Sequence, residues 1–234
     1  MPATRPNQTI LLIGASRGLG YAMAAEFLKR GWSVVGTVRG QARTSLHDLA
    51  DRSGGRLEIE TVDICEPDQI AALRARLSGR TFDVLFVNAG VTNNPRETIA
   101  DVTTEEFVRV MVTNSLSPMR VVEALHDLVS PTGTIGVMSS GQGSVGANTT
   151  GMREVYRGSK AALNMFMRSF AARHAEDSRA MVLMAPGWVR TDMGGPDGRL
   201  SVEESVPNLV NVLLSVQGTH GLQYLDYLGR TVPW

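Results

Sequence analysis

One stretch decides the fold of this chain: Ile10-Leu11-Leu12-Ile13-Gly14-Ala15-Ser16-Arg17-Gly18-Leu19-Gly20. It begins with a short apolar run, and after the glycines apolar residues recur at helical spacing until Gly31. A strand, a glycine turn and a helix in this order can bind a phosphate through the free N–H groups of the helix N-terminus. The spacing is Gly-x-x-x-Gly-x-Gly, whereas the standard dinucleotide motif reads Gly-x-Gly-x-x-Gly. A glycine cluster alone also suits a flexible turn, but its place between a buried strand and an amphipathic helix favours a cofactor site.

Apolar runs that predict strands alternate with helical patterns along the rest of the chain. The expected strands are residues 10–13, 34–38, 57–62, 84–87, 134–138, 180–185 and 222–225. This alternation predicts an α/β fold with a doubly wound, seven-stranded and mainly parallel sheet flanked by helices. Thr103 and Ser201, each followed by acids, look like helix N-caps. With 234 residues and no linker-like, repetitive or low-complexity tract, we expect a single domain over residues 1–234.

The second expected strand ends at Val38-Arg39, where an enzyme that uses NAD usually carries an acid for the ribose 2′-hydroxyl. No acid stands there. Arg39 and Arg17 can instead hold a 2′-phosphate through their guanidinium groups. Each arginine alone is compatible with an ordinary surface residue, but both together, with the acid missing, favour NADP(H).

Tyr156 and Lys160 lie four residues apart, so on a helix they share one face. An ammonium group there can lower the pKa of a phenol from about 10 toward neutrality. A tyrosine tuned in this way can exchange a proton with a carbonyl or an alcohol. The spacing also arises by chance on many helices, so the pair becomes informative only together with the glycine loop.

With both ends in view, the chain resembles the classical short-chain dehydrogenases/reductases over nearly its whole length. Gly14–Gly20 is similar to the coenzyme turn of that family, although Ile13 stands where a threonine is common. Asn88-Ala89-Gly90 and the segment Pro186-Gly187-Trp188-Val189-Arg190-Thr191 resemble two further family motifs. The run from Tyr156 to Met165 and the closing Pro233-Trp234 look most like the C-factor-like and sniffer-like carbonyl reductases.

This resemblance implies a Rossmann fold and a set of site residues. The cofactor-binding residues it implies are Gly14, Ser16, Arg17, Gly18, Leu19, Gly20, Arg39, Asp63, Ile64, Asn88, Ala89, Gly90, Tyr156, Lys160, Pro186, Gly187, Val189 and Thr191. The catalytic residues it implies are Asn114, Ser140, Tyr156 and Lys160. Asp63 matches the family's aspartate that contacts the adenine ring. Asn114 falls where the family's catalytic asparagine lies, in the long helix before the fifth strand.

The implied reaction is hydride transfer from NADPH to an aldehyde, ketone or quinone, with Tyr156 as the proton donor and Ser140 on the same oxygen. Lys160 would hold the nicotinamide ribose and lower the pKa of Tyr156, and Asn114 would help connect Lys160 to solvent through a water. One alternative is an NADP(H)-binding signalling protein without turnover. Another is an alcohol dehydrogenase that uses NAD, which predicts an acid near position 39.

Three serines compete for the place beside the nicotinamide: Ser139, Ser140 and Ser144. The usual family spacing from Tyr156 points near Gly143, which has no hydroxyl, so we expect a short insertion between Ser144 and Val155. Neighbouring residues of a strand point to opposite faces, so Ser139 and Ser140 cannot both reach the cofactor. The family pattern selects Ser140.

Composition limits the partners. Lys plus Arg and Asp plus Glu both number 23, so there is no basic excess for nucleic acid or an anionic membrane. Cys65 is the only cysteine, which suits a reducing compartment, and the four histidines lack metal-ligand spacing. Residues 1–9 are polar and no apolar run is long enough to span a membrane. We therefore expect a cytoplasmic protein with no metal, no membrane and no nucleic-acid partner, acting on a small molecule as a homodimer or homotetramer.

Overall fold

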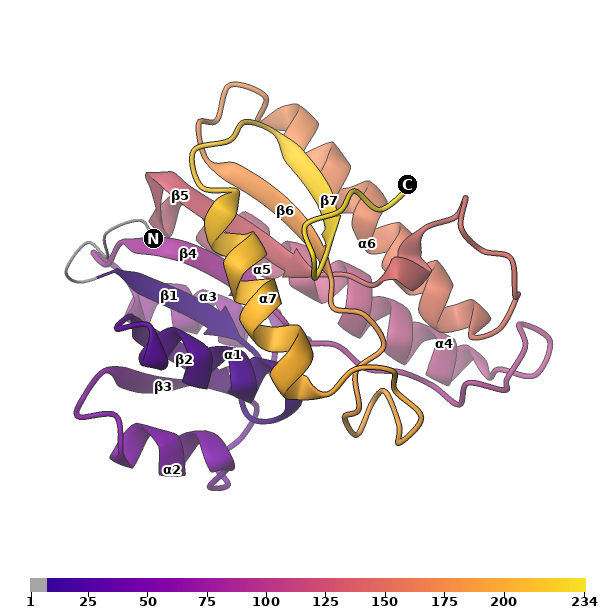
Figure 1. Ribbon diagram of the computed structural model, residues 1–234, viewed down its shortest axis with the longest axis horizontal. Helices are drawn as coiled ribbons and strands as arrows, with labels where there is room; N and C mark the ends of the chain where they lie inside the picture. The colour runs from indigo at the N-terminus through magenta and orange to yellow at the C-terminus, as the bar shows by residue number, and fades with distance from the viewer. Residues whose placement is uncertain (1–7) are drawn as a thin grey trace.

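The computed structural model describes residues 8–234 and contains a seven-stranded sheet in the order β3-β2-β1-β4-β5-β6-β7 (Figure 1). The strands are β1 (Thr9–Ile13), β2 (Ser33–Val38), β3 (Leu57–Thr61), β4 (Phe82–Val87), β5 (Val129–Met138), β6 (Ala180–Ala185) and β7 (Leu222–Asp226). Neighbouring strands pair in parallel throughout, so the sheet is fully rather than mainly parallel. The order reverses between β1 and β4, which confirms the doubly wound Rossmann fold expected from the sequence.

The strands are apolar on both faces because helices cover both faces of the sheet. Within β1, Ile10 and Leu12 join one hydrophobic core, while Leu11 and Ile13 join the other. These four side chains are at most 1% exposed. The continuous apolar run that marked β1 in the sequence therefore reflects burial from two sides.

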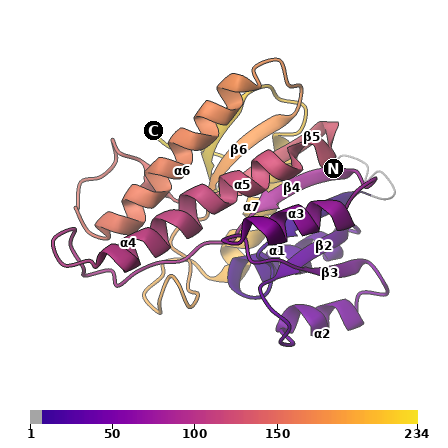
Figure 2. The ribbon, with the colours of Figure 1, turned by 180° about the vertical axis from the view of Figure 1, so that it is seen from behind.

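Two layers of helices supply the rest of these cores (Figures 1 and 2). On one face lie α1 (Gly18–Lys29), α2 (Ser45–Asp51) and α7 (Val202–Ser215), and α1 packs against α7. On the other lie α3 (Pro67–Arg76), α4 (Thr104–Met111), α5 (Ser117–Leu125) and α6 (Glu154–Arg173). No helix within residues 8–234 is long and apolar enough to cross a membrane.

Two helix starts that the sequence predicted from N-cap residues are present in the structure. Thr103 and Ser201 are the N-caps of α4 and α7, and their side chains accept the N–H groups of Glu106 and Glu204, as the sequence indicated. The expectation that residues 1–9 carry no targeting segment falls largely outside the described residues.

One strand boundary was clearly wrong. β5 begins at Val129, five residues before the expected start at Thr134. Pro131 and Gly133 interrupt the apolar pattern there, and both residue types weaken a strand prediction. The strand is nevertheless extended because Val129 pairs with Phe82, although the register shifts directly after that pair. Smaller differences affect other ends, such as β3, which stops at Thr61.

Candidate active site

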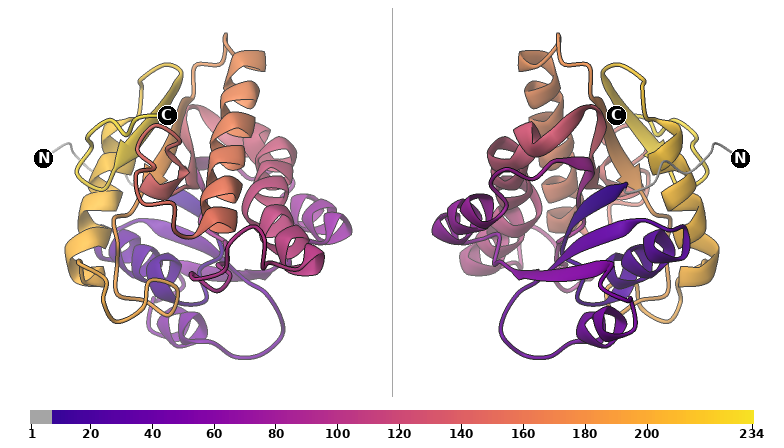
Figure 3. Two further views of the ribbon diagram at one scale, coloured as in Figure 1. Left: turned by 90° about the vertical axis from the view of Figure 1, so that its right-hand side faces the viewer. Right: turned by 90° about the vertical axis from the view of Figure 1, so that its left-hand side faces the viewer.

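The loops that follow β1, β4, β5 and β6 all leave the same edge of the sheet, because the strands are parallel (Figure 3, left). Ligands of open α/β sheets bind at this carboxyl edge, where the strand order reverses. The residues singled out in the sequence lie on these loops, at the start of α1, just after β2 and β3, on α6 and, for Asn114, in the helical segment between α4 and α5.

The glycine loop after β1 is held from two sides. Gly14 has a φ of +87°, and its N–H donates to the Thr37 hydroxyl at 2.9 Å. The Asn88 side chain donates to the Gly14 C=O at 2.8 Å. A Cβ on Gly20 would lie 2.1 Å from that same carbonyl oxygen, so only glycine fits there. Thr37 was missed in the sequence, because nothing local distinguishes a strand threonine that fixes a distant loop.

The outer side of this loop is open. Gly18, at a φ of +56°, would direct a Cβ into space with no atom within 4 Å. Arg17 precedes α1 in an extended conformation and its side chain does not cap the helix. The first N–H groups of a helix have no partner within it, so they can bind an anion at this opening. Ser16 and Leu19 are partly buried beside it.

Both arginines of the predicted 2′-phosphate site reach solvent. Arg17 pairs with Asp192 at 3.2 Å, but the two side chains are 79% and 82% exposed, so the pair is weak. Arg39, just after β2, is exposed and forms no ion pair with any residue of the described chain. Asp63, just after β3, accepts the Cys65 N–H at 2.9 Å and thereby shapes the turn containing the buried Ile64.

The expected long helix before β5 is not regular. A π-helical turn over Val112–Leu116 separates α4 from α5, and Asn114 lies in it, fully buried. Such turns are rare and often mark functional sites. The Asn114 side chain exchanges two hydrogen bonds with the backbone of Val91, at 2.8 and 2.9 Å, and donates to Ser159 at 3.0 Å. Sequence patterns missed the turn because a π turn keeps the helical spacing of apolar residues nearly intact.

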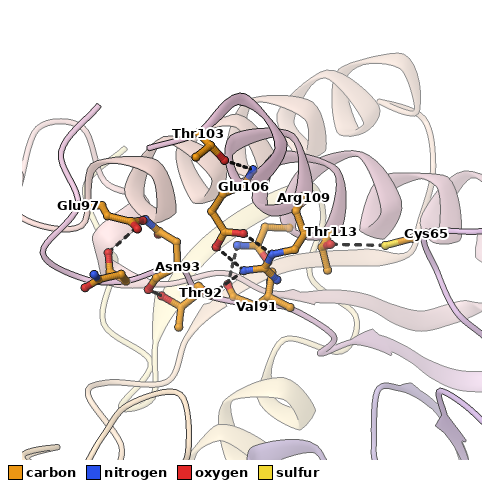
Figure 4. Close-up of polar contacts among 11 residues, drawn as sticks. Cys65, Val91, Thr92, Asn93, Glu97, Thr103, Glu106, Arg109 and Thr113 are labelled. Carbon is orange, nitrogen blue, oxygen red and sulfur yellow. Dashed lines mark hydrogen bonds and ion pairs between the residues drawn. The ribbon is translucent and has the colours of Figure 1, made fainter. Parts of the chain in front are cut away.

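A second set of hydrogen bonds fixes the loop after β4 (Figure 4). Arg109 on α4 donates to the Thr92 C=O at 3.0 Å while it pairs with Glu106 at 2.7 Å. On the same loop, the buried Asn93 donates to Glu97. The Asn88-Ala89-Gly90 segment is therefore held between the glycine loop and α4.

Lys160 is a buried ammonium with a single protein acceptor among the described residues. Its Nζ donates to the Met138 C=O at 2.9 Å, and burial lowers its pKa to about 8. A Cβ on Gly90 would lie 3.5 Å from this Nζ, so the absence of a side chain there keeps space beside the ammonium. An ammonium has three donors, and two remain for the hydroxyls of a ribose. Together with the open helix N-terminus, this geometry fits a nicotinamide dinucleotide.

Tyr156 differs from the expectation in one respect. Its pKa is raised, not lowered, because burial disfavours the phenolate more strongly than its surroundings stabilise it. A hydrogen bond with Ser140 and the positive charge of Arg153 act in the opposite direction. Lys160 lies 6.0 Å from the centroid of the tyrosine ring and does not overcome the burial.

The three candidate serines have different hydrogen-bond partners. The Ser140 hydroxyl faces Tyr156 and also accepts the Gln142 N–H at 3.1 Å. The Ser139 hydroxyl donates instead to Asn164, two turns further along α6, at 2.6 Å. Ser144 is buried in the following loop, where it accepts the Ala147 N–H. A partner that the sequence did not reveal is Tyr224 on β7, whose buried hydroxyl donates to the Ser140 C=O.

The segment after β6 folds back beside the same edge. Val189 is buried and forms a bridge with Leu200, and Thr191 accepts the Gly194 N–H at 3.1 Å. Gly187 has a φ of +82°, and the Pro186 C=O accepts the Ser205 hydroxyl at 2.8 Å. Within residues 8–234 no three His, Cys, Asp or Glu side chains are placed to hold a metal ion.

The serine geometry predicts two opposite phenotypes. Ser140→Ala should lower kcat on the order of a hundredfold with NADPH affinity retained, because the hydroxyl beside Tyr156 is lost. Ser139→Ala should keep kcat near normal but lower the free energy of unfolding by about 1–3 kcal/mol, since the buried Asn164 loses its partner. Steady-state kinetics and urea unfolding of both variants measure this. A larger loss of activity from Ser139→Ala or from Ser144→Ala than from Ser140→Ala would overturn the assignment.

Comparisons with known proteins identify the family and related structures. The model of the short chain dehydrogenase family matches residues 8–199. A putative short-chain dehydrogenase/reductase from Burkholderia multivorans, solved with bound NADP, is 67% identical, with a TM-score of 0.96 over 98% of this chain and 100% of its own. A carbonyl reductase from Pseudomonas aeruginosa in complex with NADP is 36% identical, with a TM-score of 0.89 over 97% of this chain and 99% of its own. The C-signal protein of Myxococcus xanthus is 38% identical over 65% of this chain and 92% of its own length.

Proposed function

Because the chain belongs to the short-chain dehydrogenase family of oxidoreductases, we propose that it transfers a hydride from NADPH to the carbonyl group of an aldehyde, ketone or quinone. One observation carries this proposal: Ser140 and Lys160 both lie beside the buried hydroxyl-bearing ring of Tyr156, at the carboxyl edge of the sheet. NADP in the related Burkholderia and Pseudomonas structures supports the choice of cofactor.

The cofactor supplies the hydride, and the protein supplies position and protons. Tyr156 donates its phenolic proton to the carbonyl oxygen as negative charge develops there. Its raised pKa keeps the phenol protonated at neutral pH, which suits reduction. Ser140 donates a hydrogen bond to the same oxygen and stabilises that charge.

In this proposal Lys160 binds the cofactor, and Asn114 fixes the backbone beside the site. Lys160 holds the ribose hydroxyls with the donors that Met138 does not use. Both amide hydrogens of Asn114 are donated, to Val91 and to Ser159, and its Oδ1 accepts the Val91 N–H, so the side chain fixes the π turn and the neighbouring loop. The Oδ1 keeps one further acceptor site, and the proposed water between Lys160 and solvent stays a prediction.

A binding protein without turnover is the second candidate, since one relative is named as a signal. The Ser140 contact with Tyr156 argues against it, because a pure cofactor binder has no use for a buried acid that faces the open edge. Turnover with a panel of aldehydes, ketones and quinones separates the two. A complete lack of turnover with intact NADPH binding would favour the binding protein.

Cofactor preference provides a direct prediction. NADPH should bind more tightly than NADH, and Arg39→Asp should narrow or reverse the difference, because a carboxylate repels the 2′-phosphate and accepts a ribose hydroxyl. Dissociation constants for both cofactors measure this. Arg52→Asp is the matched control, since Arg52 is an exposed arginine at the far end of α2. Equal or tighter binding of NADH by the unmodified protein would contradict the proposed site.

The homodimer or homotetramer stays a prediction. A groove of about 700 Å³ crosses the outer face of α3, α5 and α6. Leu116 and Phe166 line it and are 41% and 46% exposed, so this apolar groove is the face that we assign to the predicted subunit contact.

A further inference from the structure

One arginine beside Tyr156 has no acidic partner. Arg153 directly precedes α6, and its guanidinium carbon lies 5.9 Å from the centroid of the Tyr156 ring. The side chain is partly buried, and among residues 8–234 it forms no hydrogen bond or ion pair. Arg157, one turn further on, is different: it donates to the Met152 C=O at 2.6 Å and to Thr150 at 2.9 Å. Arg157 thus shapes the loop, whereas the guanidinium group of Arg153 lies near the Tyr156 ring and its N–H groups have no acceptor among the described residues.

The backbone of Arg153 points to a use for its side chain. Its φ of 62° and ψ of 43° are left-handed, and it is the one non-glycine residue with positive φ in the described chain. A residue with a Cβ adopts this conformation at an energetic cost, while glycine adopts it freely. Strain of this kind is concentrated at functional sites. An arginine at a position that suits glycine therefore indicates a task for the guanidinium group.

The surroundings define what that task can be. The neighbouring Glu154 accepts the Ile99 N–H at 2.8 Å, and no ion pair joins it to Arg153 among the described residues. Met152 and Val145, on the loop that leads to Arg153, are 54% and 73% exposed. The loop that leads to Arg153 therefore exposes apolar side chains, and Arg153 adds a cation without an acidic partner beside Tyr156, which suits an apolar molecule that carries a negative group.

We propose that Arg153 determines substrate specificity by binding a carboxylate on the carbonyl substrate, while Tyr156 faces the carbonyl oxygen. A guanidinium group binds a carboxylate through two parallel hydrogen bonds, which fixes orientation as well as affinity. Partial burial strengthens such a pair relative to one on the open surface. This inference rests on the proposed reductase function and adds a substrate class to it: apolar or aromatic aldehydes and ketones with a carboxylate.

The test compares three aldehydes that differ at the para position: para-carboxybenzaldehyde, which carries a carboxylate, its neutral methyl ester and the unsubstituted benzaldehyde. The unmodified protein should show the highest kcat/KM for the acid. Arg153→Gly should lower kcat/KM for the acid on the order of tenfold relative to the ester, mainly through KM. Arg153→Lys, which keeps the charge, should retain part of the preference. Any effect of the lost charge on Tyr156 itself acts on all three aldehydes and cancels in the ratio.

A loss of activity through unfolding is not expected, because glycine adopts the left-handed conformation without strain. Arg153→Gly should therefore have a melting temperature no lower than that of the unmodified protein. Arg52→Gly is the matched control and should leave the ratio of acid to ester unchanged. A ratio that stays the same in Arg153→Gly would overturn the inference.

A binding measurement separates this inference from the proposed function. Para-(hydroxymethyl)benzoate and benzyl alcohol are titrated calorimetrically into the NADP-loaded protein and into NADP-loaded Arg153→Gly. Tighter binding of the acid that disappears in the variant supports the anion site even if no aldehyde is reduced, in which case the reductase function alone fails. Equal binding of the two alcohols by the unmodified protein would overturn the anion site even if aldehydes are reduced.

Discussion

Tyr156→Phe should reduce NADPH-dependent carbonyl reduction on the order of a hundredfold or more while NADPH still binds. The variant lacks only the hydroxyl group, so no proton donor faces the carbonyl oxygen as charge develops on it. The ring is 8% exposed and packs in place, and phenylalanine preserves that packing. Steady-state kcat and KM, with the NADPH dissociation constant from fluorescence titration, measure the two effects separately.

Tyr21→Phe is the matched control for this variant. Tyr21 lies on α1 and is partly buried against the core that α1 and α7 share with the sheet, and it forms none of the contacts described around Ser140 and Tyr156. It should keep both turnover and NADPH affinity near normal. If Tyr156→Phe also kept turnover near normal, Tyr156 would not be the proton donor.

Lys160→Met should lower NADPH affinity and turnover by at least about tenfold, because two charge-assisted hydrogen bonds to the ribose are lost. The same change should raise the free energy of unfolding of the cofactor-free protein above that of the unmodified chain. This gain should be largest at neutral pH. Burial lowers the pKa of Lys160 from 10.5 to about 8, so the folded state holds this proton less tightly than the unfolded state. Below pH 8 the unmodified protein therefore carries the full cost of a buried charge.

That cost is relieved as the pH rises from about 8 to 10.5, since the unfolded state binds more protons in this window and stability then rises with pH. The advantage of Lys160→Met should shrink by about 3 kcal/mol across it. Urea unfolding at pH 7 and near pH 10 measures the difference. Lys29→Met is the control, because the Lys29 side chain is 80% exposed and should show no such trend. A constant difference between Lys160→Met and the unmodified protein at both pH values would contradict the buried charge.

Much of the fold was predictable because its signals are local. The apolar run from Ile10 to Ile13 and the glycines after it directly encode a strand buried on both faces and a turn in which Gly14 and Gly20 leave no room for a Cβ. The choice of Ser140 over Ser139 stays a prediction, and its stated reason does not apply, because both serines lie beyond the end of β5 and both contact α6. Ser139 contacts Asn164, and Ser140 faces Tyr156.

Other features depend on contacts between distant segments, which no local pattern records. Thr37 fixes the glycine loop from another strand, and Tyr224 fixes the Ser140 backbone from a strand 84 residues further on. The raised pKa of Tyr156 follows from burial by the whole fold, whereas the sequence shows only the neighbouring lysine. The strain at Arg153 likewise appears only in the folded backbone.

The most direct test of the central claim follows the hydride itself. The protein is supplied with NADPH deuterated at the transferable hydrogen of the nicotinamide, together with an aldehyde such as benzaldehyde. The account predicts that mass spectrometry finds one deuterium on the carbinol carbon of the alcohol, and that Tyr156→Phe forms far less of this product at the same NADPH occupancy. Saturating NADPH binding with no deuterium in any alcohol, across aldehydes, ketones and quinones, would contradict it.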